Sequence, residues 1–289
     1  MTDLTTLFEQ ERPRLRRLAY RMLGLVSEAE DVVQDAWLRW DRAGGKADNP
    51  QAWLVQAVTR LCLDRLKSAR ARRETYVGPW LPEPLIEAMT DDPVERAEDV
   101  SVAFLLALER LSPLERAVFL LHDVFDQDYA AVGVALGKSE PAVRQLASRA
   151  RAHVRDARPR FSVPREQAER LAAAFIAASA ANDTQALSRL LAEDAVLISD
   201  AGGKRPAALR PMVGREDVLL LLRGLASRGT IPLAGDIRPA RINGLPGVIL
   251  SDPLGPTIIA FEPDETGERI AAIYIMRNPE KLGHVLPSP

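Results

Sequence analysis

Side chains able to read nucleic-acid bases follow one another at helical spacing near the middle of the chain. They are Arg144, Gln145, Ser148, Arg149 and Arg151. Arginine can donate two hydrogen bonds to guanine and glutamine can pair with adenine in the same way, while further arginines hold phosphates without reading sequence. The spacing therefore predicts the DNA-facing side of a helix. The alternative is a basic, solvent-exposed face on an ordinary helical hairpin, and the spacing alone leaves both open.

These donors need a rigid element to hold them, and the surrounding pattern predicts one. Residues 128–155 indicate a helix, a tight turn and a second helix, with Gly137 where the turn needs a positive φ. Ser139 is placed to cap the second helix. The apolar side of the first helix is predicted to consist of Ala130, Val134 and Leu136. Two short helices joined in this way make a helix-turn-helix.

An acidic stripe runs along another predicted helix, residues 28–41. Its members recur at intervals of three and four: Asp31, Gln34, Asp35 and Leu38. A stripe of this kind, with one exposed leucine, can dock against a basic partner. The alternative is a solvated helix face, which is the usual role of such charges.

A third group combines an aromatic ring with charged side chains on the predicted helix 51–71. Its members are Trp53, Arg60, Asp64, Arg65 and Lys67. Bases of a single strand stack on rings while basic side chains meet the phosphates, so this group suits melted nucleic acid. Basic residues also stabilise the dipole at a helix C-terminus, which explains the end of this helix but explains Arg60 less readily.

The composition limits the classes of protein that remain. With 289 residues, 47% of them hydrophobic, the chain can form two or three domains with buried cores. Because the net charge of the chain is −2, binding to DNA would require that basic residues be segregated into patches, and the sequence shows such patches. The single cysteine, Cys62, excludes an internal disulfide and a multi-cysteine metal site, and we expect no metal or cofactor. We find no signal core and no apolar run of bilayer length, so we expect a cytoplasmic protein without membrane contact.

Past residue 160 the pattern changes from purely helical to mixed. Two predicted helices, a strand at 195–199, a third helix and several further strands indicate an α+β domain whose curved antiparallel sheet wraps on helices. The predicted fold class is multidomain, with two all-α domains, the second carrying the helix-turn-helix, followed by this α+β domain. The predicted divisions are 1–74, a proline-rich linker at 75–95, 96–160 and 165–289.

Three segments, in this order, resemble the extracytoplasmic-function (group IV) RNA polymerase sigma factors of bacteria. The family's core-polymerase-binding helix resembles AEDVVQDAWLRW, its −10 helix resembles NPQAWLVQAVTRLCLDRLK, and its −35-reading domain resembles the segment that begins LSPLERAVFLLHDVF. The final domain resembles a SnoaL-like cone of the NTF2-like superfold. The combination resembles the subfamily of sigma factors that carry this domain fused at the C-terminus.

The resemblance implies a partner for each group of side chains. The acidic stripe would bind the clamp helices of the polymerase's large subunit, and the group on helix 51–71 would contact the −10 strand. The helix-turn-helix, with Ser139 and the five donors, would read −35 promoter DNA, and its domain would bind the polymerase flap. We expect Arg144 and Gln145 to touch bases, and Arg149 and Arg151 mainly phosphates.

Three short signatures of the subfamily are present: WLPEP (80–84), DAGGK (200–204) and NPEKL (278–282). The regulatory residues drawn from them are Trp80, Leu81, Pro82, Asp200, Gly202, Gly203, Lys204, Asn278, Pro279 and Leu282. Ala201 stands where the subfamily usually has glycine, which puts the backbone shape of that loop in question. The resemblance implies regulation in cis, in place of a separate anti-sigma protein. Lys204, Arg205 and Arg210 near the glycine loop could meet the linker acids Glu83 or Glu87, and the alternative is a solvated loop, the usual role of a single such pair.

The sequence thus predicts a dissociable sigma factor, monomeric when free, that directs core RNA polymerase to specific promoters. One alternative is a stand-alone helix-turn-helix regulator, which would need neither the acidic stripe nor the −10 group. Another is an enzyme with a catalytic SnoaL-like domain. After residue 160 the only histidine is His284, and the sequence shows no recognisable pair of a general acid and a general base. We therefore assign no catalytic residue. The cone could hold a small apolar ligand.

Overall fold

The computed structural model describes residues 4–86, 101–154, 163–227, 237–252 and 254–285. The chain forms two compact units, one from Met1–Thr75 with Ala103–Arg158 and the other from Tyr76–Val102 with Pro159–Pro289. The described part of the predicted linker, residues 75–86, therefore belongs to the second unit except for Thr75. Residues 87–95 of that linker, and 155–160 of the predicted helix-turn-helix domain, lie outside the described residues.

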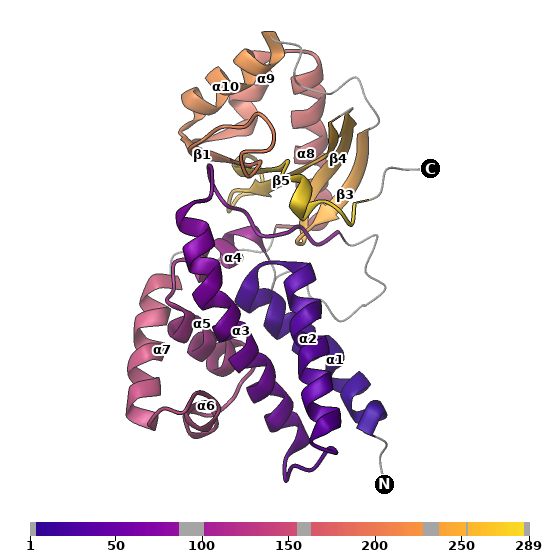
Figure 1. The fold of residues 1–289 in the computed structure, drawn as a ribbon. Helices are drawn as coiled ribbons and strands as arrows, with labels where there is room; N and C mark the ends of the chain where they lie inside the picture. Colours follow the sequence, from indigo (N-terminus) through magenta and orange to yellow (C-terminus); the bar gives the residue numbers. More distant parts are fainter. Residues whose placement is uncertain (1–3, 87–100, 155–162, 228–236, 253, 286–289) are drawn as a thin grey trace. The chain divides into compact units, whose positions relative to one another are not determined.

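The first half of the first unit is a three-helix assembly (Figure 1). Its helices are α1 (Leu4–Leu23), α2 (Val26–Arg42) and α3 (Pro50–Glu74). Each packs on the other two. The apolar stripe of α2 is buried, with Val32, Val33 and Trp40 almost inaccessible to solvent. Burial of this stripe leaves the opposite, acidic side of α2 outward.

The second half of the first unit contains the helix-turn-helix. Its elements are α4 (Val102–Glu109), α5 (Pro113–Phe119), the π-helical turn η3 (Leu120–Val124), α6 (Tyr129–Leu136) and α7 (Glu140–Val154). A capping box between Ser112 and Glu115, with Pro113 in the first turn, starts α5. Gly137 ends α6 with φ of 63°, so the glycine predicted for the turn has the left-handed conformation that favours it.

The predicted apolar side of α6 was wrong. Ala130 and Val134 are exposed, and Leu136 is only partly buried. The buried side carries Val132, Gly133 and Ala135. A Cβ added to Gly133 would lie 2.8 Å from the carbonyl oxygen of Lys138, so the glycine permits the close turn and fixes which side faces inward.

In the described residues of the second unit, three α-helices lie on a six-stranded sheet. The helices are α8 (Arg165–Ala180), α9 (Thr184–Leu190) and α10 (Arg215–Ser227). The strands are β1 (Leu191–Asp200), β2 (Met212–Val213), β3 (Ile237–Ile242), β4 (Leu245–Asp252), β5 (Gly255–Pro263) and β6 (Ile270–Met276), followed by the short 3-10 helix η4 (Pro279–Lys281). The strand order is β2-β1-β6-β5-β4-β3.

The α+β fold class is confirmed, with one correction to the sheet. Strands β1 and β6 run parallel, and the other neighbours pair antiparallel, so the sheet is mixed and not wholly antiparallel. The parallel pair brings the end of β1 beside the end of β6, with Asp200 opposite Met276. The DAGGK signature, which begins at Asp200, is thereby brought beside the NPEKL signature, which begins two residues after Met276.

The two faces of this sheet have different partners. Alternate residues of the strands, among them Phe261 and Ile273, join the helices in one apolar core. Residues of the other set, among them Ala260 and Tyr274, face the linker prolines Pro82 and Pro84 across a cavity of about 20 Å³. That volume holds about one water molecule. The linker therefore covers the sheet face opposite the helices.

Candidate functional site

The predicted acidic stripe lies on the solvent side of α2. Asp31, Gln34 and Leu38 are exposed and Asp35 is half-buried. Leu38 keeps 43% of its surface in solvent, so the stripe includes one exposed apolar side chain. Both carboxylates of the stripe contact the guanidinium of Arg65, at 3.4 Å from Asp31 and 3.3 Å from Asp35. The structure thus presents the four side chains on one surface, with a basic residue from α3 beside them.

The predicted −10 group is spread over two sides of α3. Arg60, Asp64 and Lys67 are exposed, and Asp64 pairs with Lys67 at 2.9 Å. Trp53 is half-buried and packs against Trp40, with 5.3 Å between ring centroids. Arg65, as described above, is directed to α2. The structure therefore keeps four members available near a common surface and turns one toward the acidic stripe.

The predicted −35 side chains all lie on the exposed side of α7 or just before it. Ser139, Arg144, Gln145, Ser148, Arg149 and Arg151 are exposed, whereas Val143, Ala147 and Ala150 on the same helix are buried. Arg144 pairs with Glu140 and lies over the ring of Tyr129, 4.3 Å from its centroid. Hydrogen bonds to Asp123 and Tyr129 raise the pKa of Arg151. The arginines are therefore held in position by neighbours while their guanidinium groups remain accessible.

A buried polar network joins the linker to the end of β1 in the second unit. Asp200 has no exposed surface and accepts four hydrogen bonds: from the Tyr76 hydroxyl at 2.5 Å, the Leu81 amide at 2.8 Å, the Lys281 ammonium at 2.8 Å and the Gly202 amide at 3.1 Å. Buried charge is tolerated only where donors satisfy it in this way. Burial, with the hydrogen bond to Asp200, raises the pKa of Tyr76, so that hydroxyl stays protonated as a donor.

Lys281 completes the network from η4. Its ammonium group donates to the carbonyl oxygen of Leu81 at 2.5 Å as well as to Asp200, and it lies 4.2 Å from the centroid of the Trp80 ring. A desolvated ammonium over a tryptophan face gains a cation–π attraction. Lys281 thus binds two residues of WLPEP and the first residue of DAGGK at once.

The remaining signature residues shape the loop around this network. Asn278 donates to the Tyr76 hydroxyl at 2.8 Å, and its side-chain oxygen accepts the Glu280 amide, which starts η4. Gly202 and Gly203 have φ of 57° and 73°, and a Cβ on Gly202 would lie 2.6 Å from Asn278. Both glycines are therefore required. Ala201 is not among the positive-φ residues, so the alanine that departs from the subfamily pattern fits this loop.

Farther along, the linker pairs with the sheet edge. Leu85 and Asn243 exchange hydrogen bonds of 3.1 and 2.8 Å, and Ile86 forms an antiparallel bridge with Ile242 of β3. Between these contacts, the ring nitrogens of His284 lie 3.1 Å from a Glu83 carboxylate oxygen and 3.2 Å from the Pro84 carbonyl oxygen. The hydrogen bond to Glu83 raises the pKa of His284.

Several of these residues were not predicted. Tyr76, Asn243, Lys281 and His284 each contribute a side chain to linker docking. Lys281 stands inside the NPEKL signature, which is the sequence signal that could have found it. Lys204 does not pair with Glu83: its ion pair is with Glu280 of the NPEKL segment, at 3.2 Å. Glu87, its other predicted partner, lies outside the described residues.

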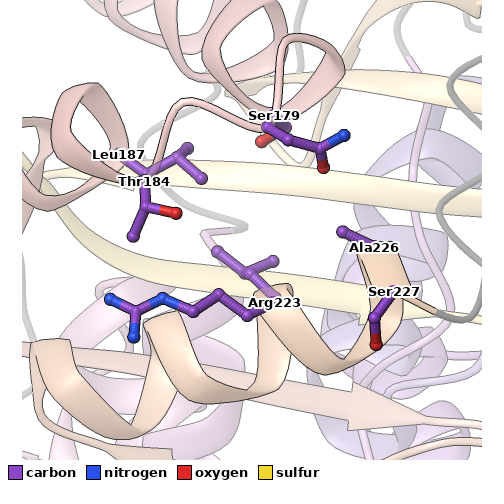
Figure 2. Close-up of a pocket in the computed structure, with 8 residues that line it drawn as sticks. Ser179, Thr184, Leu187, Arg223, Ala226 and Ser227 are labelled. Carbon is purple, nitrogen blue, oxygen red and sulfur yellow. The ribbon is translucent and has the colours of Figure 1, made fainter.

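A pocket of about 290 Å³ lies between α8, α9 and α10, and its lining side chains are drawn in Figure 2. Arg223, Ala226 and Ser227 line it from α10, and Thr184 and Leu187 from α9. Its described lining offers hydroxyl groups, an amide and a guanidinium, with no histidine or carboxylate to act as a general base. Leu187 and Leu222, which also line this pocket, belong to the apolar core of the domain.

An acid–base pair does exist elsewhere in the domain. The Tyr274 hydroxyl donates to Glu262 at 2.5 Å, and burial raises the pKa of both groups. Tyr274 borders the cavity of about 20 Å³ beneath the linker, which has no room for a substrate. Among the described residues no cluster of three metal-ligating side chains is found. In the same part of the chain, no helix has the length and apolarity needed to cross a bilayer.

Comparison with known proteins agrees with this arrangement. Residues 7–72 match the family Sigma-70 region 2, and residues 101–154 match Sigma-70, region 4. The chain is 40% identical over 289 residues to the ECF RNA polymerase sigma factor SigJ of Mycobacterium tuberculosis, an alignment that covers 95% of this chain and 92% of that protein. The chain belongs to the ECF RNA polymerase sigma factors.

The similarity of this sigma factor to SigJ extends over both units. The crystal structure of Mycobacterium tuberculosis SigJ matches with a TM-score of 0.78 at 37% identity, covering 96% of this chain and 98% of that one. The second unit is accordingly the fused SnoaL-like domain. The probable ECF sigma factor SigI of the same organism is 38% identical over 186 residues, which is 62% of this chain and 64% of that protein.

Proposed function

We propose that this sigma factor binds core RNA polymerase through the acidic stripe of α2 and promoter DNA through α3 and α7. In this proposal the stripe meets the clamp helices of the large subunit, and the domain of α7 also meets the flap. The −10 strand contacts come from Trp53, Arg60, Asp64 and Lys67. The exposed set of donors on α7 carries the proposal, because the helix buries one side and leaves base-reading groups on the other.

The SnoaL-like domain regulates initiation by holding the linker that joins the two DNA-binding domains. Residues 76–86 are docked on it through Asp200, Lys281 and Asn243. Eleven residues span at most about 36 Å when fully extended, at roughly 3.3 Å per residue. Docking withdraws that length from the connection between the −10 and −35 readers. Release of the linker would let the readers adopt the separation that a promoter demands.

The same proposal covers the remaining partner predictions. A sigma subunit works where core polymerase works, in the bacterial cytoplasm, and it binds polymerase as a single copy, so we expect a free monomer. A small ligand in the SnoaL-like domain stays a prediction. The pocket in Figure 2, which lies against the apolar core of the domain, is the place to look for it.

Run-off transcription with purified bacterial core polymerase on a genomic promoter pool tests the proposal. We expect transcripts that are absent with core polymerase alone. The double variant R144A/Q145A should lose them. R110A, which removes one exposed positive charge outside every proposed surface, should retain them. If no form produced transcripts and the protein bound duplex DNA without polymerase, it would be a stand-alone regulator.

A further inference from the structure

Arg65 lies between the two carboxylates of the acidic stripe. One of its terminal nitrogens is 3.4 Å from Oδ2 of Asp31, and the other is 3.3 Å from Oδ2 of Asp35. The first nitrogen also donates to the carbonyl oxygen of Glu28 at 3.3 Å, which ties the side chain to the start of α2. The Arg65 side chain is 27% exposed, against 66% for Asp31 and 47% for Asp35. The guanidinium therefore lies beneath the carboxylates, on the protein side.

The position of the guanidinium reduces the repulsion between the two carboxylates of the stripe. Asp31 and Asp35 are four positions apart on one helix face, a spacing at which like charges repel. The guanidinium between them offsets that repulsion and reduces the freedom of both side chains. It contacts Oδ2 of each carboxylate. Within the described chain, no hydrogen bond engages Oδ1 of either residue, so that atom remains available to a partner.

We propose that Arg65 is a positioning residue for polymerase binding, which presents Asp31 and Asp35 in fixed orientations to a basic surface of core polymerase, and not a contact to the −10 strand. The inference rests on the proposed function, because it assumes that the stripe binds polymerase. It also revises the assignment of Arg65 to promoter DNA.

The sign of the effect follows from the geometry. Removing Arg65 leaves two neighbouring carboxylates that repel each other and rotate freely, so binding must order them at a cost. We expect R65A to weaken the affinity for core polymerase about three- to tenfold, in keeping with the modest strength of exposed ion pairs. If Arg65 instead masked the stripe, R65A would bind core polymerase more tightly, and that result would overturn the proposal.

The test is the equilibrium affinity of the full-length, fluorescently labelled protein for core polymerase in the absence of DNA. R65A is compared with R110A, the matched loss of one exposed positive charge. The measurement is repeated in a D31N/D35N background. If Arg65 acts through these carboxylates, R65A has no further effect in that background. Thermal unfolding of R65A checks that the domain is intact, and R65K should restore part of the affinity.

The outcomes separate the inference from the function on which it rests. If D31N/D35N did not weaken core binding, the proposed role of the stripe would be wrong. If D31N/D35N weakened binding but R65A lowered affinity equally in both backgrounds, Arg65 would act independently of the carboxylates. Binding of −10 single strands by holoenzyme at saturating core polymerase gives a third reading, with R60A as positive control. If R65A weakened binding of −10 single strands but had normal affinity for core polymerase, Arg65 would contact promoter DNA and the proposal would be wrong.

Discussion

Two ion pairs, one in each unit, illustrate opposite uses of charge in this sigma factor. Arg144 and Glu140 on α7 keep 59% and 44% of their side-chain surface in solvent, whereas Lys281 and Asp200 keep 6% and 0%. An exposed pair gains little from its Coulomb attraction because water and salt screen it. A buried pair is costly to form and still more costly to break, because a lone charge would remain out of water.

The difference corresponds to what each surface must do. Under the proposed function, the side chains of the acidic stripe and of α7 exchange one partner for another on binding polymerase or DNA, so weak, solvated pairs suit them. The linker site must instead select one docked arrangement. Asp200 with its four donors and Lys281 with its two acceptors do so, because a shifted linker would leave these buried groups unsatisfied.

Breaking the buried pair should have the largest effect. K281M removes the only cation that Asp200 contacts among the described residues and leaves its carboxylate buried. We expect the second unit to lose about 3–5 kcal/mol of unfolding free energy, as when one partner of a buried pair is removed. Denaturant unfolding of the full-length protein measures this. Released linker should also change run-off transcription at matched folded concentrations.

K204M is the matched control for this prediction. Lys204 also pairs with an acid of the NPEKL segment, Glu280, but both partners are exposed. Its loss should cost less than about 1 kcal/mol. Equal effects of K204M and K281M on unfolding would mean that burial does not set the strength of the linker site, and the comparison between the two units would fail.

The His284 contact should make linker docking depend on pH. Its two ring nitrogens face two acceptors, the Glu83 carboxylate and the Pro84 carbonyl, and only the protonated ring can donate to both. The folded-state pKa is raised above the ordinary value of about 6.5. The contribution to stability is therefore complete below about pH 6.5 and is lost as pH rises through the folded-state pKa.

Thermal unfolding between about pH 6 and pH 9 measures this contribution. The full-length protein should lose stability of its second unit over that range relative to H284N, which cannot carry the charge. E83Q should flatten the pH dependence in the same way, because it removes the carboxylate that raises the pKa. An unchanged pH profile in both variants would show that the charged ring does not hold the linker.

Local features of the fold could be predicted from the sequence, whereas the linker site depended on distant neighbours. The helix at 165–180 and the turn at Gly137 follow from periodicity and from a residue suited to positive φ. The buried side of α6 could not be predicted, because YAAVGVAL is apolar around nearly the whole helix and has no polar face opposite an apolar one. Close approach at Gly133 decides it.

The same limit applies to the candidate sites. The exposed donors of α7 could be predicted, because they share one helix face. The partners of Asp200 come from Tyr76, Leu81 and Lys281, up to 124 residues away. The parallel pairing of β1 with β6 brings the segment of Lys281 beside Asp200, and docking of the linker adds Tyr76 and Leu81. Strand order and linker docking are tertiary properties that periodicity does not encode. The subfamily signatures marked the segments but not the contacts.

The smallest effect on stability is expected at the exposed pair of α7. E140Q removes the charge that faces Arg144 four positions along the helix. We expect the unfolding free energy of the first unit to change by less than about 0.5 kcal/mol. The Tyr129 ring should continue to hold the Arg144 guanidinium by stacking, so −35 recognition should persist.

R144A, in contrast, should reduce discrimination at one base pair by about 1–3 kcal/mol in promoter competition assays. A large loss of stability in E140Q would show that the pair of Arg144 with Glu140 stabilises the fold. Normal base discrimination in R144A would show that Arg144 does not read a base.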